Sequence, residues 1–252
     1  MNRLEKILLW TVAIAAVAAV GGPAVAQQAH YHGFADQRAW AGLPNALDVL
    51  SNLPFAVGGL WGLLVLKHQP PGVQRGLAAL FFAGLLLAAL CSGIYHWQPD
   101  NVRLALDRAG MVPVFAGLLG LAVADRSSDR AGLWTASAVL LWGPLSVAVW
   151  SATGNLLPWA VLQGGGMLLV LGLALCPPRP GAWGIRLGGV IAAYALAKWL
   201  EQGDHSVFAW TGGVVSGHSL KHAVAALAAW PVLAVMASRT AVGTARHTAV
   251  AD

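Results

Sequence analysis

The feature that most constrains this chain is a series of long apolar stretches separated by short polar breaks. A helix needs about 20 mostly apolar residues to cross the hydrocarbon core of a membrane. Eight stretches meet this requirement, with limits near residues 7–26, 44–66, 76–97, 103–124, 131–150, 156–176, 183–200 and 214–237. The connections are short and contain helix breakers such as Pro70-Pro71 and Pro177-Pro178, which leaves no room for a second, soluble domain.

The composition agrees with this interpretation. Only 10% of the 252 residues are charged and 58% are hydrophobic, whereas ordinary soluble domains contain roughly 25% charged residues. A disordered chain would need the opposite balance of charge and hydrophobicity. The formal net charge is +5, but the basic residues are spread over short loops, so no nucleic-acid partner is expected. We predict an all-α polytopic membrane protein built as a seven-helix bundle.

The first apolar stretch fits two interpretations. Arg3 and Lys6 precede an apolar core that ends in Ala24-Val25-Ala26, which is the layout of a signal peptide cleaved after Ala26. The alternative is an additional transmembrane helix that is retained. The predicted organisation is therefore a signal peptide or extra helix over residues 1–26, an outer segment over 27–43, a seven-helix domain over 44–237 and an inner tail over 238–252.

The distribution of Lys and Arg predicts the orientation, because the short loops on the cytoplasmic side are enriched in them. If the segment before Pro44 lies outside, most basic residues fall on the inner side. These are Lys67, Arg75, Arg126, Arg130, Arg179, Arg186, Arg239 and Arg246. The outer loops at residues 151–156 and 201–213 contain none. Together with the Ala-x-Ala signal, this pattern favours a bacterial inner membrane with the outer loops in the periplasm.

Polar side chains within the apolar stretches are the candidates for chemistry, because an ionisable group is costly inside a membrane. Ser92 and His96 are four residues apart at the end of the second core helix and share one helix face. Asp107 lies one turn inside the next helix, and His218 and His222 share a face at the start of the last one. The predicted topology brings all five side chains to one depth in the outer half of the bundle.

These residue types suit a metal-dependent hydrolase. Three neutral imidazoles with one open position are the ligand set of a catalytic zinc ion, here His96, His218 and His222. Water on such an ion ionises near neutral pH, and Asp107 is placed to accept its proton. Ser92 could donate a hydrogen bond to the developing oxyanion. Asp107 and Ser92 are therefore the candidate catalytic residues.

Each of these residues also has a simpler interpretation when it is taken alone. A pair of histidines four residues apart is a weak signal for a metal site by itself. The Ser92 hydroxyl could bond to a carbonyl one turn back, and Asp107 could pair with Arg103 or Arg108 at the start of its helix. The shared depth of the five residues is what favours a common site.

As a set, the motifs resemble the alkaline ceramidase family and the wider superfamily of seven-helix membrane hydrolases that includes the adiponectin and progestin receptors. The shared pattern is Ser-x3-His, a following Asp and a late His-x3-His, and the likeness spans about residues 31–237. The segment Asp48-Val49-Leu50-Ser51-Asn52 also looks like the ceramidase branch. The resemblance implies that the three histidines bind zinc, that the Asp is the acid/base group and that the Ser assists the oxyanion. It implies hydrolysis of ceramide to a sphingoid base and a fatty acid.

One departure from the family concerns calcium. Animal alkaline ceramidases carry a run of acidic residues before and into the first helix that binds calcium, whereas this chain has only Asp36, Asn45 and Asp48 around Arg38. This departure argues against a calcium ion. We interpret Asp36 and Asn45 as loop and helix-capping residues, and Asp48 as bonded to a neighbouring helix.

Three further polar residues lie near the histidine pair. Glu201 and Asp204 fall in the outer loop before it, and we interpret them as solvated loop residues. The alternative is a role in gating the substrate or supporting a ligand imidazole. Lys221 is expected to face away from the ligands toward a lipid head group.

The leading hypothesis is thus a zinc-dependent amidase that acts on an N-acyl lipid within the membrane. One alternative is a seven-helix receptor or sensor in which zinc is structural, although such a site would not need Ser92 and Asp107. A second alternative is an acyl-ester lipid hydrolase on the same fold, and a transporter is a third. The expected partners are the lipid substrate and the membrane, and the sequence leaves the oligomeric state open.

Overall fold

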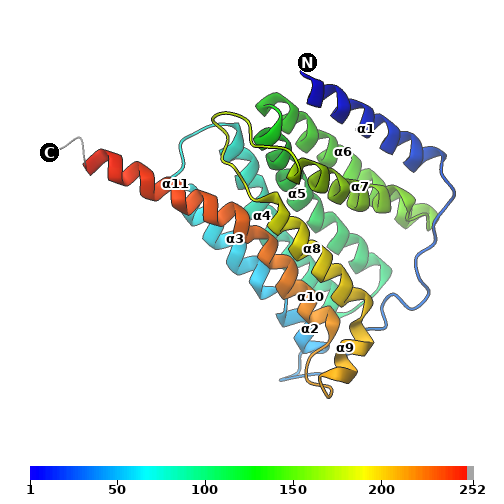
Figure 1. Ribbon diagram of the computed structural model, residues 1–252. Coiled ribbons are helices and arrows are strands. Elements are labelled where there is room, and N and C mark those ends of the chain that lie inside the picture. Colours follow the sequence, from blue (N-terminus) through cyan, green and yellow to red (C-terminus); the bar gives the residue numbers. More distant parts are fainter. Residues whose placement is uncertain (249–252) are drawn as a thin grey trace.

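A computed structural model describes residues 1–248 of the chain, with side chains up to residue 240. Every regular element in this part is helical, apart from two isolated β-bridges. The long helices run side by side and form a bundle (Figure 1). The predicted all-α class is confirmed.

Seven helical segments among the described residues are long and apolar enough to cross a membrane. They are α1 (Arg3–Gly21), α2 with α3 (Ala46–Leu50 and Leu53–Leu66), α4 (Val73–Trp97), α5 (Asn101–Arg126), α6 (Asp129–Thr153), α7 (Leu157–Ala174) and the segment Gly217–Thr240. This last segment contains α10 (Gly217–Ala226), the 3-10 turn η1 (Leu227–Ala229) and the first part of α11 (Trp230–Thr248). The chain is therefore a multi-pass membrane protein.

The helix predicted over residues 183–200 is shorter than expected and begins later. α8 covers Leu187–Gln202, or 16 residues, which is about 24 Å of helix. Gly184 and Ile185 stay outside it because their amides donate to the Asp125 carboxylate at 2.8 and 3.1 Å. α8 still packs against α7 and α10 and completes the core, and α9 (Asp204–Trp210) follows it.

The N-terminal helix is an integral part of the bundle in this structure. α1 begins with a capping box formed by Asn2 and Glu5 and lies along α7 (Figure 1). The buried Glu5 carboxylate accepts a hydrogen bond from the Ser128 hydroxyl at 2.7 Å and pairs with Arg130 at 3.1 Å. α1 therefore starts at the end of the bundle where α6 starts. Cleavage after Ala26 stays a prediction.

Two of the spanning segments are interrupted at prolines. Pro54 has no N–H to donate to the carbonyl of Leu50, so the first core segment breaks at Ser51 and restarts as α3. Pro231 has the same effect in the last segment, where the 3-10 turn precedes α11. The first break matters for the site, because it redirects the backbone at Ser51.

Close packing fixes α4 against α5. A Cβ atom on Gly84 of α4 would lie 2.6 Å from the Val114 nitrogen and 2.8 Å from the Pro113 carbonyl carbon. Only glycine allows two helices to approach so closely. This contact holds the two helices that carry Ser92, His96 and Asp107 in a fixed relation.

Asp125, which the sequence interpretation did not single out, ties the ends of several elements together on the predicted inner side. Its fully buried carboxylate accepts hydrogen bonds from the Gln74 amide at 3.2 Å and from the two loop amides before α8, and it pairs with Arg126. A buried carboxylate needs such partners, because an unpaired charge is costly in a low-dielectric interior. The network joins α4, α5 and the loop that leads into α8.

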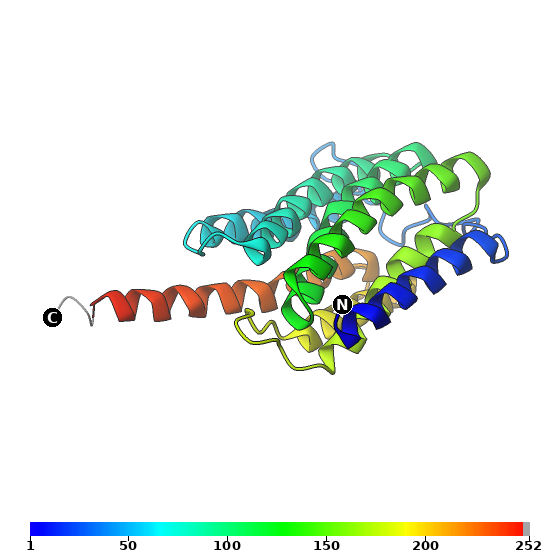
Figure 2. The same cartoon turned by 90° about the horizontal axis from the view of Figure 1, so that it is seen from above.

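The last helix is longer than predicted. α11 runs past the expected end at residue 237 to Thr248, and Figure 2 shows it extending beyond the other helices. Residues 238–248 of the predicted tail are therefore helical. Residues 249–252 lie outside the described residues, as does the side chain of Arg246.

Candidate metal centre

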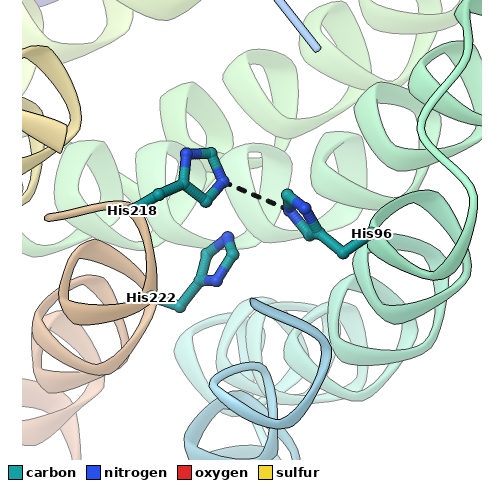
Figure 3. Close-up of side chains that lie close together, drawn as sticks. All are labelled: His96, His218 and His222. Atoms are coloured by element: carbon teal, nitrogen blue, oxygen red, sulfur yellow. Dashed lines mark hydrogen bonds between the residues drawn. The ribbon is translucent and has the colours of Figure 1, made fainter. Parts of the chain in front are cut away.

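Three imidazoles meet at the end of the bundle opposite Asp125. One ligand atom from each of His96, His218 and His222 lies within 4.8 Å of the others, and all three side chains are buried. Their ring centroids are 4.8 to 4.9 Å apart and form a nearly equilateral triangle (Figure 3). Among the described residues this is the one group of three or more His, Cys, Asp or Glu side chains close enough to hold a metal ion. The predicted convergence of the three histidines is confirmed.

The α4–α5 hairpin supplies the first ligand. His96 lies in the last turn of α4 and is 1% exposed, and its carbonyl accepts a hydrogen bond from the Asn45 amide at 2.9 Å. The chain turns at Asp100, whose carboxylate caps the first turn of α5. This tight turn brings Asp107, in the second turn of α5, back toward Ser92 one turn before His96.

The α10 helix supplies the other two ligands, and two buried carboxylates hold its first turn. Asp204 accepts a hydrogen bond from the His218 backbone amide at 2.8 Å and from the Ala35 amide at 2.9 Å. Asp48, which is fully buried, accepts a hydrogen bond from the Ser219 hydroxyl at 2.6 Å. The N-terminus of a helix favours negative charge, so both carboxylates stabilise the turn that carries His218.

A serine at the helix break orients the third ligand. The Nδ1 atom of His222 lies 2.8 Å from the Ser51 hydroxyl oxygen, and that hydroxyl donates to the Asp48 carbonyl at 2.9 Å. Because the Ser51 proton is used on Asp48, Nδ1 of His222 must be the donor. The Nε2 lone pair of His222 then points into the triangle, which is the arrangement that a metal ligand needs.

The other two rings also present nitrogens to the centre. The Nε2 atoms of His96 and His218 lie 3.3 Å apart (Figure 3). Among the described residues, the Nδ1 atom of His96 is buried without a hydrogen-bond partner. Neutral imidazoles with available lone pairs are the donors that zinc and other borderline transition metals prefer. The residues therefore fit a metal ion, while the geometry leaves its identity open.

An aromatic ring packs over two of the three imidazoles. Phe34 is 5% exposed, and its ring centroid lies 4.8 Å from that of His96 and 4.3 Å from that of His218. The segment that carries Phe34 is fixed by the Ala35 amide on Asp204 and by the His205 ring, which lies 3.1 Å from the Gly33 carbonyl. The segment over residues 27–43, predicted only as an outer connection, thus closes the site.

Ser92 and Asp107 line a cavity that reaches the third ligand. The two side chains come from α4 and α5, and His222 of α10 lines the same cavity. The simpler interpretation of Asp107 as half of an ion pair with a neighbouring arginine is wrong. Arg103 pairs with Asp100 instead, and the Arg108 guanidinium stacks over the Trp150 ring at 4.0 Å and donates to Gln27.

Two interpretations of nearby residues need correction. Glu201 and Asp204 are not solvated loop residues. Glu201 belongs to α8, is 18% exposed and pairs with Lys198 and Lys221. Asp204 is 8% exposed and accepts hydrogen bonds from the backbone amides of His218 and Ala35. Lys221 does not face away from the site, because its ammonium donates to the Glu201 carboxylate at 2.5 Å and lines the cavity of Asp107. Neither contact could be predicted from the sequence, since both depend on how α8, α9 and α10 fold back on one another.

The three residues considered for calcium bind three separate partners. Both oxygens of Asp36 accept from the Arg38 guanidinium, at 2.8 and 2.7 Å, and Asp48 accepts from Ser219. The expectation that the Asn45 side chain caps its helix is wrong, because this side chain makes no capping hydrogen bond and donates to the His96 carbonyl. With the Asp36 carboxylate engaged by a cation of the chain itself, these residues do not fit a calcium site.

The chain matches no model of a known protein family and no curated protein. The resemblance to the alkaline ceramidases stays a prediction from the five motif residues of the sequence.

Proposed function

We propose that the protein is a membrane-embedded, zinc-dependent amidase that hydrolyses the N-acyl bond of ceramide-like lipids to a sphingoid base and a fatty acid. The observation that carries this proposal is the convergence of three buried imidazoles beside a cavity lined by Ser92 and Asp107. A metal ligand set, an acid/base group and a hydroxyl donor at one place are the parts that acyl hydrolysis requires.

Zinc is the proposed ion because the three histidines would supply three of its four ligands and leave one position for water or substrate. When bound, zinc supplies a Lewis acid that polarises an acyl carbonyl and acidifies a water molecule. The chain's own residues would handle the proton and the developing charge. The Asp107 carboxylate takes the proton of the attacking water and returns it to the leaving nitrogen, and the Ser92 hydroxyl donates to the carbonyl oxygen as it becomes negative.

The cavity supports a lipid as the substrate. Most of its wall is apolar, with side chains from α4, α5, α7 and α8 such as Phe81, Leu118 and Val190. An acyl chain gains about 0.8 kcal/mol for each methylene that it buries in such surroundings. An acyl chain inserted there would bring its carbonyl group to the polar end of the cavity, at Ser92 and Asp107.

The strongest rival is a receptor or sensor with structural zinc. A structural site is closed by its protein ligands and has no use for an acid/base carboxylate on an adjoining cavity. An ester hydrolase on the same site differs only in the leaving atom, since the same groups cleave either acyl linkage.

The test is the release of fatty acid by purified full-length protein, loaded with zinc, from a panel of N-acyl and O-acyl lipids that includes ceramide. We expect release from the N-acyl lipids and none after zinc is removed by a chelator. Release from the O-acyl lipids alone would favour the ester hydrolase. No release from any lipid would overturn the proposal and favour the receptor.

We further propose a bacterial inner membrane with the metal centre toward the periplasm. The proposal is supported by the basic residues at the ends of α3, α5 and α7, opposite the histidines, together with the short outer loops that contain none. A cysteine placed at Ser151 should react with a membrane-impermeant reagent in intact cells, and one placed at His68 should not. The reverse labelling would overturn the orientation.

A further inference from the structure

The cavity beside the metal centre contains a second polar cluster that the proposed reaction does not use. Lys198 and Glu201 of α8 and Lys221 of α10 line the cavity together with Ser92, Asp107 and His222. Polar groups in a mostly apolar cavity are few and fix the orientation of whatever binds there. The position of this cluster next to the reacting groups makes it a candidate for recognition of the substrate.

The three side chains form one hydrogen-bonded unit. The Lys221 ammonium donates to one oxygen of Glu201 at 2.5 Å, and the Lys198 ammonium donates to the other oxygen. The Lys221 and Glu201 side chains are each 18% exposed, and Lys198 is 40% exposed. Glu201 therefore holds both lysines at the wall of the cavity.

The cluster carries a net positive charge and unused donors. Two ammonium groups and one carboxylate give a charge of +1, and both carboxylate oxygens are already engaged. An ammonium group has three N–H donors, and within the part of the chain whose side chains are described each lysine uses one of them on Glu201. The cluster thus offers donors and charge to a ligand that carries acceptors and negative charge.

We infer that Lys198 and Lys221 bind a carboxylate on the head group of the substrate, next to the amide that is cleaved. This inference rests on the proposed amidase function and changes its expected substrate from ceramide-like lipids to long-chain N-acyl amino acids. The acyl chain occupies the apolar part of the cavity, the amide lies at Ser92 and Asp107, and the carboxylate lies against the two lysines.

The charge of the product favours this class over ceramide. Hydrolysis of ceramide leaves a sphingoid base, which has no carboxylate for the two lysines to bind. Hydrolysis of an N-acyl amino acid leaves an amino acid that keeps its carboxylate for the lysines. A charge-assisted hydrogen bond is worth about 1.5–3 kcal/mol, so the carboxylate should raise kcat/KM by about 10- to 100-fold.

The first experiment compares two substrates of equal acyl length, N-palmitoylglycine and N-palmitoylethanolamine, on the zinc-loaded full-length protein. They differ in the carboxylate alone, which is replaced by a hydroxymethyl group. We expect kcat/KM for the glycine conjugate to exceed that for the ethanolamide by about tenfold or more. The Lys221→Gln and Lys198→Gln variants should reduce this ratio toward one, whereas Lys67→Gln, an exposed lysine at the other end of the bundle, should leave it unchanged.

The second experiment measures binding without turnover. Isothermal titration of N-palmitoylglycine into the metal-free protein should give a Kd that rises about tenfold in Lys221→Gln and returns toward the original value in Lys221→Arg. The arginine variant also shows that a variant at this position folds. Equal Kd values for the original protein and for Lys221→Gln would overturn the inference.

The outcomes separate the two proposals. A substrate ratio near one in the original protein, with both substrates cleaved, would overturn the carboxylate site and leave the amidase standing. Tight carboxylate binding that depends on Lys221, without cleavage of either substrate, would overturn the amidase and with it the substrate assignment.

Discussion

The imidazole of His222 and the hydroxyl of Ser51 lie 2.8 Å apart although 171 residues separate them in the chain. The bond fixes which nitrogen of His222 carries the proton, and it joins the helix break at Ser51 to the metal centre. Replacing Ser51 by Ala should therefore lower the affinity for zinc by about 10- to 100-fold, the usual effect of losing such a supporting bond. Competition with a fluorescent chelator measures this affinity. Ser151→Ala, at an exposed serine, is the matched control, and equal affinity in both variants would contradict the role of Ser51.

The ligand set itself is tested by metal content. The purified protein should contain about one zinc per chain, and His96→Ala, His218→Ala and His222→Ala should each remove most of it. His68→Ala should not, because His68 is exposed near the other end of the bundle. Elemental analysis gives the answer, and a full complement of metal in all three variants would mean that these histidines are not the ligands.

Asp107 should matter for turnover and not for metal binding. Asp107→Asn keeps the shape of the side chain and removes its ability to accept a proton, so activity should fall by about 100- to 10,000-fold. Zinc content should stay at the original level, because Asp107 is not one of the converging ligands. Activity close to the original rate would remove Asp107 from the proposed mechanism.

Phe34 should control access to the metal. Its ring covers His96 and His218, so Phe34→Ala should speed the removal of zinc by a chelator while the three ligands stay in place. Trp40→Ala is the control, because Trp40 belongs to the same segment but is 69% exposed. Stopped-flow measurement of zinc release compares the two. Equal release rates would show that the Phe34 ring does not limit access.

The attachment of the same segment should depend on pH. Hydrogen bonds from the Arg38 guanidinium lower the pKa of Asp36 below its usual value of 3.8. A lowered pKa in the folded state stabilises that state above pH 3.8, and this stabilisation is lost as the pH falls through the folded pKa. Asp36→Asn should therefore reduce the thermal stability of the protein at pH 7, and the difference from the original protein should shrink as the pH is lowered toward 3. A difference that is constant from pH 7 to pH 3 would contradict this role.

Much of the fold could be predicted from the sequence, because each helix that crosses a membrane must be apolar over about 20 residues. Apolar length predicted the spanning segments, and their alternating direction predicted that His96, His218 and His222 would share one depth. The errors at helix limits have local causes. The amides of Gly184 and Ile185 bond to Asp125 and delay the start of α8.

The supporting residues of the site could not be predicted, because their contacts arise between segments whose relative placement no pattern encodes. Ser51 reaches His222 only because Pro54 interrupts the first core segment. Phe34 and Asp204 meet the site through irregular loops, where neither helical spacing nor hydropathy specifies direction. Lys221 lies between His218 and His222 in α10, but its partner Glu201 belongs to α8, and the sequence does not encode how these two helices are placed.

The separation of the ligands along the chain also has a consequence for biogenesis. His96 lies in the first half of the chain and is synthesised early, whereas His218 and His222 lie in the last fifth of the chain and are synthesised late. A nascent chain with only one of the three imidazoles lacks the proposed ligand set, so the proposed ion would be acquired only after α10 is in place. Zinc content would then count completed molecules, and a truncated translation product would be metal-free and easily told from the mature protein.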